Sequence, residues 1–306
     1  MKAPAPIILF VYNRPEHTKK TLDALAANHL AGASELFIYI DGIKPGTAEK
    51  DIQRSQEVKK IAGAENRFKN TTIITADINK GLARSVIDGV SNTLLSYDKV
   101  IVLEDDLETS AYFLTFMNDA LELYQPADNV ACISGYIYPV AEKLPETFFI
   151  RGADCWGWAT WKRAWDLFEP DGKYLLDQLT SKQLLYDFNF YDSYPYSKML
   201  KDQIEGKNNS WAVRWYASAY LHDKLTLYPS TSFVRNIGID GTGTHSGKRD
   251  FWRVDDLANK IQVQKIEAVE DKNAKMIIAR YFRIIMKKSL SGRVKYAVRN
   301  ILNRFS

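Results

Sequence analysis

The sequence predicts an α/β protein with a mostly parallel sheet flanked by helices. Short apolar runs alternate with helical patterns through the first half of the chain, which is the order that βαβ units produce. The early apolar runs are nearly continuous, as expected for strands covered on both faces. The expected strands are residues 7–12, 36–41, 71–76, 99–103 and 130–134, and the expected helices lie near residues 18–28, 48–61, 82–95 and 112–124.

The second half of the chain has a different character. It is rich in Trp and Tyr, its strands are harder to place, and the polar stretch 238–247 predicts a loop. The end of the chain repeats apolar residues at helical spacing, which predicts one or two amphipathic helices broken near residues 289–292. We therefore divide the chain into residues 1–125, 126–265 and 266–306.

Composition and length exclude several classes of protein. A chain of 306 residues with 46% hydrophobic and 25% charged residues is globular rather than disordered. Its two cysteines, Cys132 and Cys155, exclude a disulfide-stapled scaffold and lack the spacing of a zinc site. No run reaches the roughly 18–20 apolar residues that span a bilayer. Pro4 and Pro6 lie where a signal peptide would have its apolar core, so we expect a cytoplasmic protein.

Charge is distributed unevenly along the chain. Residues 272–306 contain ten basic residues and no acidic ones, whereas the remainder carries 31 basic and 37 acidic residues. A basic amphipathic end predicts attachment to an anionic membrane surface, here the inner face of the cell membrane. Nucleic acid is the competing anion, but the chain has no recognisable nucleic-acid module, so none is expected. The alternative is an ordinary helix packed on the body with a solvated basic face.

Three consecutive acids, Glu104, Asp105 and Asp106, directly follow the apolar run 99–103. Adjacent carboxylates repel one another unless a cation or hydrogen-bond donors offset the charge. In an open α/β sheet, ligands bind outside the carboxyl ends of the strands. Oxygen-only ligands suit Mg²⁺ or Mn²⁺, which can neutralise a departing diphosphate. The alternative is that the acids cap the next helix, whose first turn is expected at residues 110–113.

Basic residues follow two of the other expected strands. Arg14 lies between the first strand and the first helix, where its guanidinium can meet a phosphate at the edge of the sheet. The alternative is an ordinary surface arginine. Lys80 and Arg84 follow the third strand and can face a nucleotide, with Gly81 permitting close approach of the backbone. Their spacing is not that of a P-loop.

Residues 103–107 and the aromatic helix start at 111–113 resemble the metal motif of the glycosyltransferases of the Rossmann-like GT-A fold. The resemblance is greatest to the family of N-acetylglucosaminyltransferase I. Residues 12–15 and 18–25 are similar to that family's first strand-to-helix turn, and 40–42 lie where these enzymes contact the nucleotide. It covers residues 6–125 well and the rest loosely. It implies that Arg14 binds the nucleotide or its diphosphate, Asp41 the base or ribose, and Asp106 the metal, with Glu104 and Asp105 beside the donor. A turn-forming Asp-Gly stays open as the alternative for Asp41.

The second half is expected to bind the acceptor. Aromatic rings suit the apolar faces of sugars, and similar bacterial glycosyltransferases carry a Trp-Gly-Trp segment that matches Trp156 and Trp158. Trp211 and Arg214 are further candidates for substrate contact. The alternative for the tryptophans, above all Trp161 and Trp165, is a hydrophobic core. In the polar stretch 238–247, His245 is a candidate to ligate the metal or to donate to the diphosphate, since related sequences have Thr-His there. The alternative for His245 is a solvated loop histidine.

An inverting transferase needs a carboxylate that takes the proton of the acceptor hydroxyl. Sequences that resemble this one tend to carry Trp-Asp-x-x-Trp, but here Ala212 occupies the Asp position. Three explanations stay open. The chain could be a variant whose base was removed, which we favour slightly, or it could bind sugar nucleotide without efficient transfer. In the third explanation the base lies elsewhere, at Asp154, Asp202, Glu205 or Asp240.

The sequence therefore predicts a metal-dependent glycosyltransferase that moves a sugar from a nucleoside-diphosphate sugar to a saccharide or lipid-linked glycan acceptor. In this interpretation residues 1–125 bind the donor, residues 126–265 bind the acceptor, and residues 266–306 form the basic tail. Inversion and a role in bacterial surface glycan synthesis are expected. A sugar-nucleotide pyrophosphorylase is disfavoured because residues 12–15 lack a glycine-rich basic loop. A non-catalytic sugar-nucleotide or membrane-binding module is the remaining alternative, and Ala212 is its best support.

Overall fold

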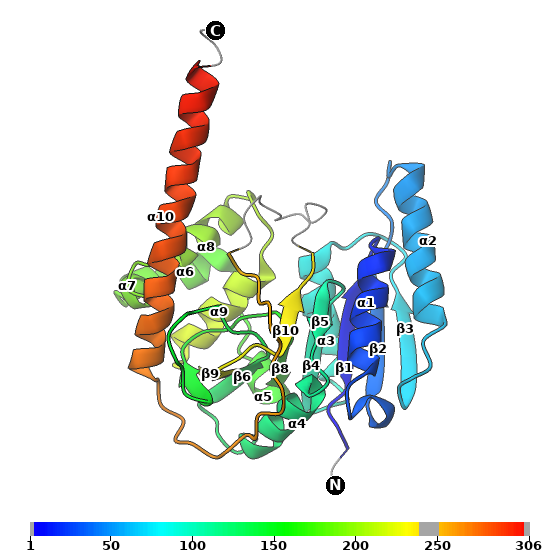
Figure 1. The fold of residues 1–306 in the computed structure, drawn as a ribbon. Coiled ribbons are helices and arrows are strands. Elements are labelled where there is room, and N and C mark those ends of the chain that lie inside the picture. Colours follow the sequence, from blue (N-terminus) through cyan, green and yellow to red (C-terminus); the bar gives the residue numbers. More distant parts are fainter. Residues whose placement is uncertain (1–2, 239–250, 303–306) are drawn as a thin grey trace.

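The computed structural model describes residues 3–238 and 251–302, with side chains described up to residue 287. An eight-stranded sheet forms its centre, and helices lie on both sides of it (Figure 1). The strands are β1 (Ile7–Val11), β2 (Glu35–Ile40), β3 (Asn70–Thr75), β4 (Lys99–Glu104), β6 (Val130–Ser134), β7 (Thr147–Ile150), β8 (Trp158–Trp161) and β9 (Leu225–Pro229). Their order across the sheet is β3-β2-β1-β4-β8-β6-β9-β7.

The helices of the described chain connect and cover these strands. In the first half they are α1 (Pro15–Ala26), the short 3₁₀ helix η1 (Ala31–Ala33), α2 (Glu49–Gly63), α3 (Leu82–Thr93) and α4 (Phe113–Leu123). In the second half they are α5 (Lys162–Trp165), α6 (Gly172–Ser181), α7 (Leu185–Phe188), α8 (Tyr196–Ile204), α9 (Trp211–Leu221) and α10 (Lys272–Leu302). The α/β class, the five expected strands and the four expected helices of the first half are therefore confirmed, within one to three residues at their ends.

The sheet is mostly parallel, as the sequence predicts. Strand β1 pairs in parallel with both β2 and β4, and β2 pairs in parallel with β3. Strand β8 runs antiparallel to β4 and β6, and β7 runs antiparallel to β9. The carboxyl ends of β1, β2, β3 and β4 consequently lie at one edge of the sheet, where candidate residues of the first half follow them.

A second, two-stranded sheet adjoins this edge. Strands β5 (Leu107–Thr109) and β10 (Val234–Asn236) pair antiparallel, so a short strand lies between the acids and α4. The acids therefore do not cap α4, which was the alternative for their role. The sequence did not predict this pair, because each strand is three residues long and their pairing joins segments more than a hundred residues apart. The pair brings the residues after β10 against the acids.

The tryptophans of the second half form a hydrophobic core. Trp158 is completely buried and its ring lies 5.5 Å from that of Trp211 and 5.8 Å from that of Trp165. Trp161 is 2% exposed and donates its indole N–H to the Leu121 carbonyl. These packed rings confirm the core alternative for Trp161 and Trp165. The same burial corrects the expectation that Trp158 and Trp211 face a sugar.

The end of the described chain is one continuous helix, α10, without the expected break near residues 289–292. Its first turns pack on the body, since Ile277, Ile278 and Ile285 are buried, although Ile284 is half exposed. Figure 1 shows the distal part of α10 standing clear of the body. None of the described helices combines the length and the apolar character needed to cross a membrane.

A buried ionic network fixes α10 to the body. Lys275 is fully buried, and its Nζ lies 2.9 Å from Asp187 Oδ2 and 3.1 Å from Glu270 Oε1. Arg151 also contacts Asp187, at 2.6 Å, and Tyr220 donates its hydroxyl hydrogen to the same carboxylate. Lys275 therefore does not belong to a solvated basic face, which corrects part of the expectation for the tail.

Removing the buried cation tests this network. Lys275→Ala is expected to lower the free energy of unfolding by about 3 kcal/mol, because it removes a fully buried cation that pairs with two partly buried carboxylates and leaves Arg151 alone to offset them. Urea unfolding measures the difference. Lys272→Ala, an exposed position at the start of the same helix, is the control and is expected to change stability by less than about 0.5 kcal/mol. Equal effects of the two substitutions would contradict the network's role.

Candidate functional site

The candidate site is built at the carboxyl edge of the sheet, where Arg14 bridges the end of β1 to the acids after β4. Arg14 Nη1 lies 2.8 Å from Asp106 Oδ2 and 3.6 Å from Asp105 Oδ1. Its Nη2 donates to the Gly238 carbonyl at 3.3 Å. The side chain of Arg14 is only 19% exposed. The structure thus brings together two of the sequence-predicted residues, Arg14 and Asp106, and Arg14 is no ordinary surface arginine.

The backbone around the acids is held by two neighbouring segments, α1 and the chain after β10. Thr21 of α1 donates its hydroxyl hydrogen to the Asp105 carbonyl at 2.8 Å. The Ile237 amide donates to the Asp106 carbonyl at 2.8 Å. A Cβ at Gly238 would lie 2.2 Å from Asp106 Oδ2, so only glycine allows the chain after β10 to pass this close. The position of Asp106 is therefore fixed before any ligand arrives.

The other two acids carry poorly compensated charge. Burial, followed by repulsion from Asp106 and Asp105, raises the pKa of Glu104 to about 8. Burial and repulsion from Asp106 likewise raise the pKa of Asp105 to about 7, although Arg14 opposes the shift. Among the described residues, no hydrogen bond or ion pair reaches the Glu104 carboxylate. A cation placed here would relieve both carboxylates.

The donor atoms of this cluster fit a hard divalent cation. They are carboxylate oxygens, which suit Mg²⁺ or Mn²⁺ rather than a thiophilic metal. In the described part of the chain, no three His, Cys, Asp or Glu side chains already surround one point. Arg14 occupies Oδ2 of Asp106, so a cation that used this oxygen would displace the guanidinium. His245, the other expected metal ligand, and Asp240, an alternative base, lie outside the described residues.

Asp41 fastens two loops to each other. Its carboxylate accepts hydrogen bonds from the amides of Gly42, Lys80 and Gly81, each at 2.8 Å. It also accepts one from the Asn79 side chain at 3.0 Å. A Cβ at Gly42 would lie 2.3 Å from the Ile78 backbone, so the two loops touch directly. These four donors favour the turn-forming role of Asp41, while its contact with a nucleotide stays a prediction.

Lys80 and Arg84 lie near this junction but are paired elsewhere. Lys80 Nζ is 3.1 Å from Asp88 and Arg84 Nε is 2.8 Å from the same carboxylate. Although burial opposes the shift, hydrogen bonds from the two cations lower the pKa of Asp88. Arg84 is 71% exposed and is thus free to turn toward a ligand. The expectation that these cations face a nucleotide stays a prediction.

A second carboxylate, Asp154, precedes β8 at the same edge of the sheet. Tyr138 donates to its Oδ1 at 2.5 Å and Tyr228 to its Oδ2 at 2.7 Å. Burial raises the pKa of Asp154, and these two hydrogen bonds oppose the rise. Strand β8 pairs with β4 so that Trp158 is opposite Val102, which brings the segment before β8, with Asp154, toward the end of β4 where the acids lie. Sequence reasoning found Asp154 but missed both tyrosines, because their only signal was the general abundance of Tyr.

The remaining acceptor candidates separate into accessible and enclosed residues. Trp156 is half-buried and its ring packs edge-on against Tyr136 at 4.7 Å, so part of its surface stays open. Arg214 is 8% exposed and donates to the Ser210 and Pro170 carbonyls, which corrects its expected contact with substrate. Ala212 lies in the first turn of α9 and is half-buried.

Asp202 and Glu205, two of the alternative bases, are engaged on the surface of α8. Asp202 lies 2.5 Å from Lys198, and Glu205 contacts Lys207. Hydrogen bonds from these lysines lower the pKa of both carboxyls. A carboxylate stabilised in this way is a weaker proton acceptor than one enclosed by tyrosines. Among the described alternatives, Asp154 is therefore the best-placed base.

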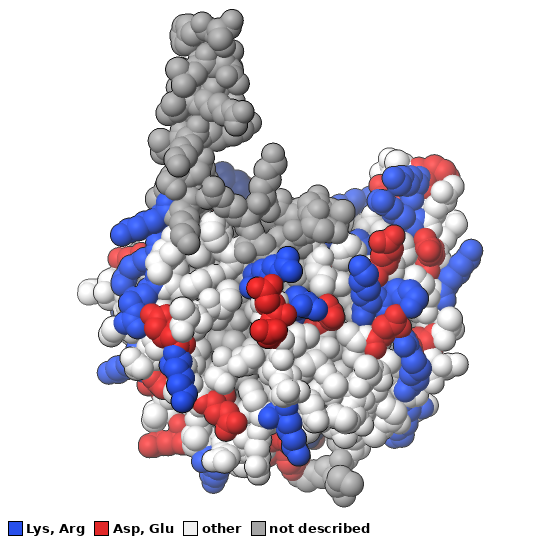
Figure 2. Space-filling view, viewed as in Figure 1, with Lys and Arg blue, Asp and Glu red and all other residues white. Residues whose placement is uncertain are grey.

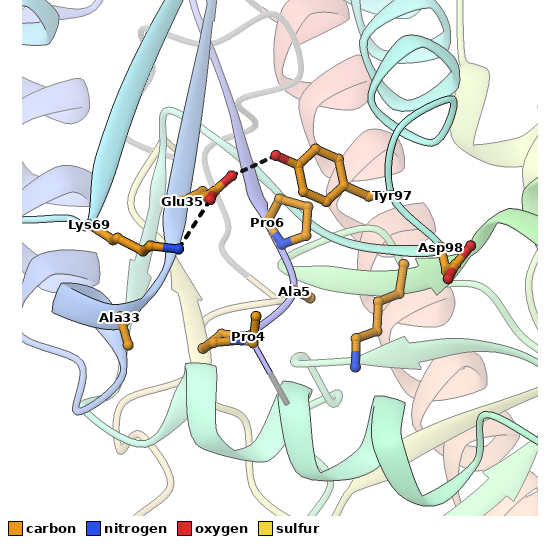
Figure 3. A pocket seen from close by; sticks show the side chains of 10 residues that line it. Pro4, Ala5, Pro6, Ala33, Glu35, Lys69, Tyr97 and Asp98 are labelled. Atoms are coloured by element: carbon orange, nitrogen blue, oxygen red, sulfur yellow. Dashed lines mark hydrogen bonds and ion pairs between the residues drawn. The ribbon is translucent and has the colours of Figure 1, made fainter. Parts of the chain in front are cut away.

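Charged side chains of the described residues also lie on the molecular surface and near the amino ends of the strands. On the face seen in Figure 2, acidic and basic side chains are interspersed over the described residues. A cavity of about 160 Å³ opens beside the amino ends of the strands, next to Pro4 and Pro6 (Figure 3). Its Glu35 accepts a hydrogen bond from Tyr97 at 2.5 Å and lies 3.4 Å from Lys69. These charges are paired, so the cavity offers little chemistry.

Comparison with solved structures gives distant likenesses. TarS from S. aureus superposes with a TM-score of 0.42 and 12% identity over 76% of this chain. Glucosyl-3-phosphoglycerate synthase from Mycobacterium tuberculosis, in complex with Mn²⁺, uridine diphosphate and phosphoglyceric acid, gives 0.34 and 12% over 60% of this chain. The match spans 36% of TarS and 66% of the synthase. No family model and no curated protein matches the sequence.

The raised pKa of Glu104 leads to a stability prediction. An unfolded glutamate ionises near pH 4.5, but the folded chain keeps Glu104 protonated to about pH 8. The free energy of unfolding therefore falls progressively between these pH values, because this glutamate ionises there only in the unfolded chain. Without divalent metal, we expect the free energy of unfolding of Glu104→Gln to be roughly 2–4 kcal/mol higher than that of the wild type at pH 8.5. Near pH 4.5 the two free energies should be equal.

Chemical denaturation in EDTA at the two pH values measures this difference. Glu146→Gln, at an exposed glutamate, serves as the control and is expected to follow the wild type throughout. A stability difference for Glu104→Gln that is the same at both pH values would contradict the buried charge.

Proposed function

We propose that the chain is a metal-dependent glycosyltransferase of the GT-A type that takes its sugar from a nucleoside-diphosphate sugar. The observation that carries this proposal is the Arg14–Asp106 pair beside two further carboxylates with raised pKa values, Glu104 and Asp105, at the carboxyl edge of a parallel sheet. This is where open α/β sheets bind ligands. The motif resemblance of residues 103–107 supports the same function independently of the geometry.

In this proposal, the residues of this edge have separate roles in binding a diphosphate. Asp106 would hold Mn²⁺ or Mg²⁺, with Glu104 and Asp105 supplying further negative charge. When bound, the ion would supply positive charge that stabilises the departing diphosphate. Arg14, released from Asp106, would donate its fork of N–H groups to phosphate oxygens. The Asp41 junction, with Lys80 and Arg84 next to it, would border the nucleotide.

The acceptor would lie on the side of Asp154 and Trp156. The register of β8 against β4 sets Trp158 level with Val102, and continuing it by two residues brings Trp156 level with Glu104. A half-open tryptophan ring there suits the apolar face of a saccharide. We propose that Asp154 takes the proton from the acceptor hydroxyl, which then attacks the anomeric carbon with inversion. Tyr138 and Tyr228 hold the carboxylate in place.

The cellular role rests on the tail and is the least direct part of the proposal. The distal part of α10 projects from the body (Figure 1), and the sequence there is basic without acidic residues. Such a helix suits an anionic membrane surface at the cytoplasmic face. An enzyme held there would act on a saccharide or lipid-linked glycan acceptor in bacterial surface polysaccharide synthesis.

Donor binding is the first test. Calorimetric titration with a panel of nucleoside-diphosphate sugars is expected to show binding of at least one in Mn²⁺ and none in EDTA. Asp106→Asn is expected to weaken that binding at least tenfold, which is about 1.4 kcal/mol. Asp98→Asn, at the other end of β4, is the matched control and should retain affinity. No heat with any donor, or unchanged affinity in Asp106→Asn, would overturn the proposal.

The base is tested by two substitutions compared in one transfer assay. If Asp154 accepts the proton, Asp154→Asn should lower turnover about 100-fold or more while donor binding persists. Ala212→Asp should then leave turnover near the wild-type value. The opposite pattern, with Asp154→Asn fully active and Ala212→Asp strongly activating, would mean that the chain lacks its base at position 212. A chain that binds donor but transfers nothing in any form would be a binding module.

A further inference from the structure

The two edge strands of the main sheet, β7 and β3, differ in what pairs with their outer sides. At one edge, β7 is fully buried, and the segment before α10 pairs with it through the Asp271 amide, which donates to the Phe149 carbonyl at 2.7 Å. At the other edge, β3 has one neighbour, β2. The two edges lie on opposite sides of the molecule, with α10 beside β7 (Figure 1). Within the described chain, nothing pairs with the outer side of β3.

Strand β3 lacks the features that normally protect an open edge. Its sequence, Asn-Thr-Thr-Ile-Ile-Thr, contains no charged residue and no proline. Ile73 is 41% exposed and Ile74 is 36% exposed, so apolar side chains are open on both faces of the strand. Unpaired, β-branched and uncharged edges are templates for adding another strand. The outer side of β3 is therefore open to pairing with another strand.

The hydrogen-bonding pattern shows which groups are available. The Ala76 amide donates to Ile40 of β2, so the alternate residues before it also face β2. Thr71, Ile73 and Thr75 therefore direct their N–H and C=O groups outward. These three residues are spaced symmetrically about Ile73. An antiparallel copy of β3 can thus pair with them, joining Ile73 to Ile73 and Thr71 to Thr75.

The charges that flank the strand favour such a copy. Lys69 immediately precedes β3, its side chain is 53% exposed, and Asp77 is the first charged residue after the strand. In an antiparallel pair, the beginning of each strand lies beside the end of the other. Each Lys69 would then approach the Asp77 of the opposite copy, giving two complementary contacts from one sequence. A parallel pair would instead place like charges together.

We propose that β3 is a homodimerisation edge, at which two copies pair antiparallel across a two-fold axis through Ile73. The two eight-stranded sheets then form one continuous sheet. Because the strands of the two copies run in opposite directions, the two acidic sites lie on opposite edges and both stay open. The interface uses none of the proposed donor or acceptor residues, so it does not depend on the proposed function.

Sedimentation of the full chain between 1 and 100 µM gives the first readout of the pairing. We expect a species of twice the chain mass. Ile73→Lys should weaken dimerisation at least tenfold, since it brings two cations together on the axis. Leu95→Lys, at a residue 78% exposed outside β3, is the control. A wild-type monomer at 100 µM, or an Ile73→Lys variant that dimerises normally, would overturn the proposal.

Cysteine crosslinking tests the register of the proposed β3–β3 pair, and it does so by trapping the dimer, without a substitution that weakens the protein. Ile73→Cys should form a disulfide-linked dimer under mild oxidation, because directly opposed Cα atoms about 5.5 Å apart suit a disulfide. Ile74→Cys would be diagonal to its own copy and should crosslink no more than the wild type.

Asp77→Lys should weaken the dimer, and adding Lys69→Glu should restore it. Equal crosslinking at positions 73 and 74, or no restoration, would refute this register.

Discussion

The structure of the candidate site depends on the electrostatic balance between Arg14 and the three acids that end β4. Three adjacent carboxylates at the end of an apolar strand repel one another, and the surrounding protein leaves them little contact with water. Arg14 offsets one charge directly, at Asp106, and leaves Glu104 and Asp105 with raised pKa values. The fold tolerates this cost through fixed backbone contacts from α1 and the chain after β10. Carboxylates with such raised pKa values are typical of functional sites.

The carboxylate of Asp154 is stabilised by hydroxyl groups instead of a cation. Asp154 is enclosed like the acids but receives one tyrosine hydroxyl on each oxygen. Neutral donors stabilise a carboxylate less than a guanidinium does, so the group keeps more of its basicity. The same edge therefore holds one carboxylate paired with a cation and another suited to accepting a proton. This difference in environment supports different roles for Asp106 and Asp154.

The first half of the fold could be read from the sequence because its signals are local. Continuous apolar runs and helical periodicity indicate β1 to β4 and their helices. The acids are recognisable because they directly follow the apolar run of β4. The features that were missed depend on contacts between distant segments. Pairing of β5 with β10, the enclosure of Trp158 and Trp211, and the burial of Lys275 against Asp187 all join residues that local pattern cannot relate. Trp158 and Lys275 show that the same residue type serves as surface or core according to partners elsewhere in the chain.

The position of Gly238 shows how such a distant contact completes the site. The acids and Arg14 come from the first 106 residues, but the carbonyl of Gly238 accepts from Arg14, and its missing side chain leaves room for Asp106. A larger residue would displace either the carboxylate or the strand pair β5–β10 that positions it. A residue of the second half of the chain thus completes the cluster formed by the first half. Because the same guanidinium contacts both Asp106 and Gly238, any ligand that draws Arg14 away from the acid also changes its hold on the chain after β10.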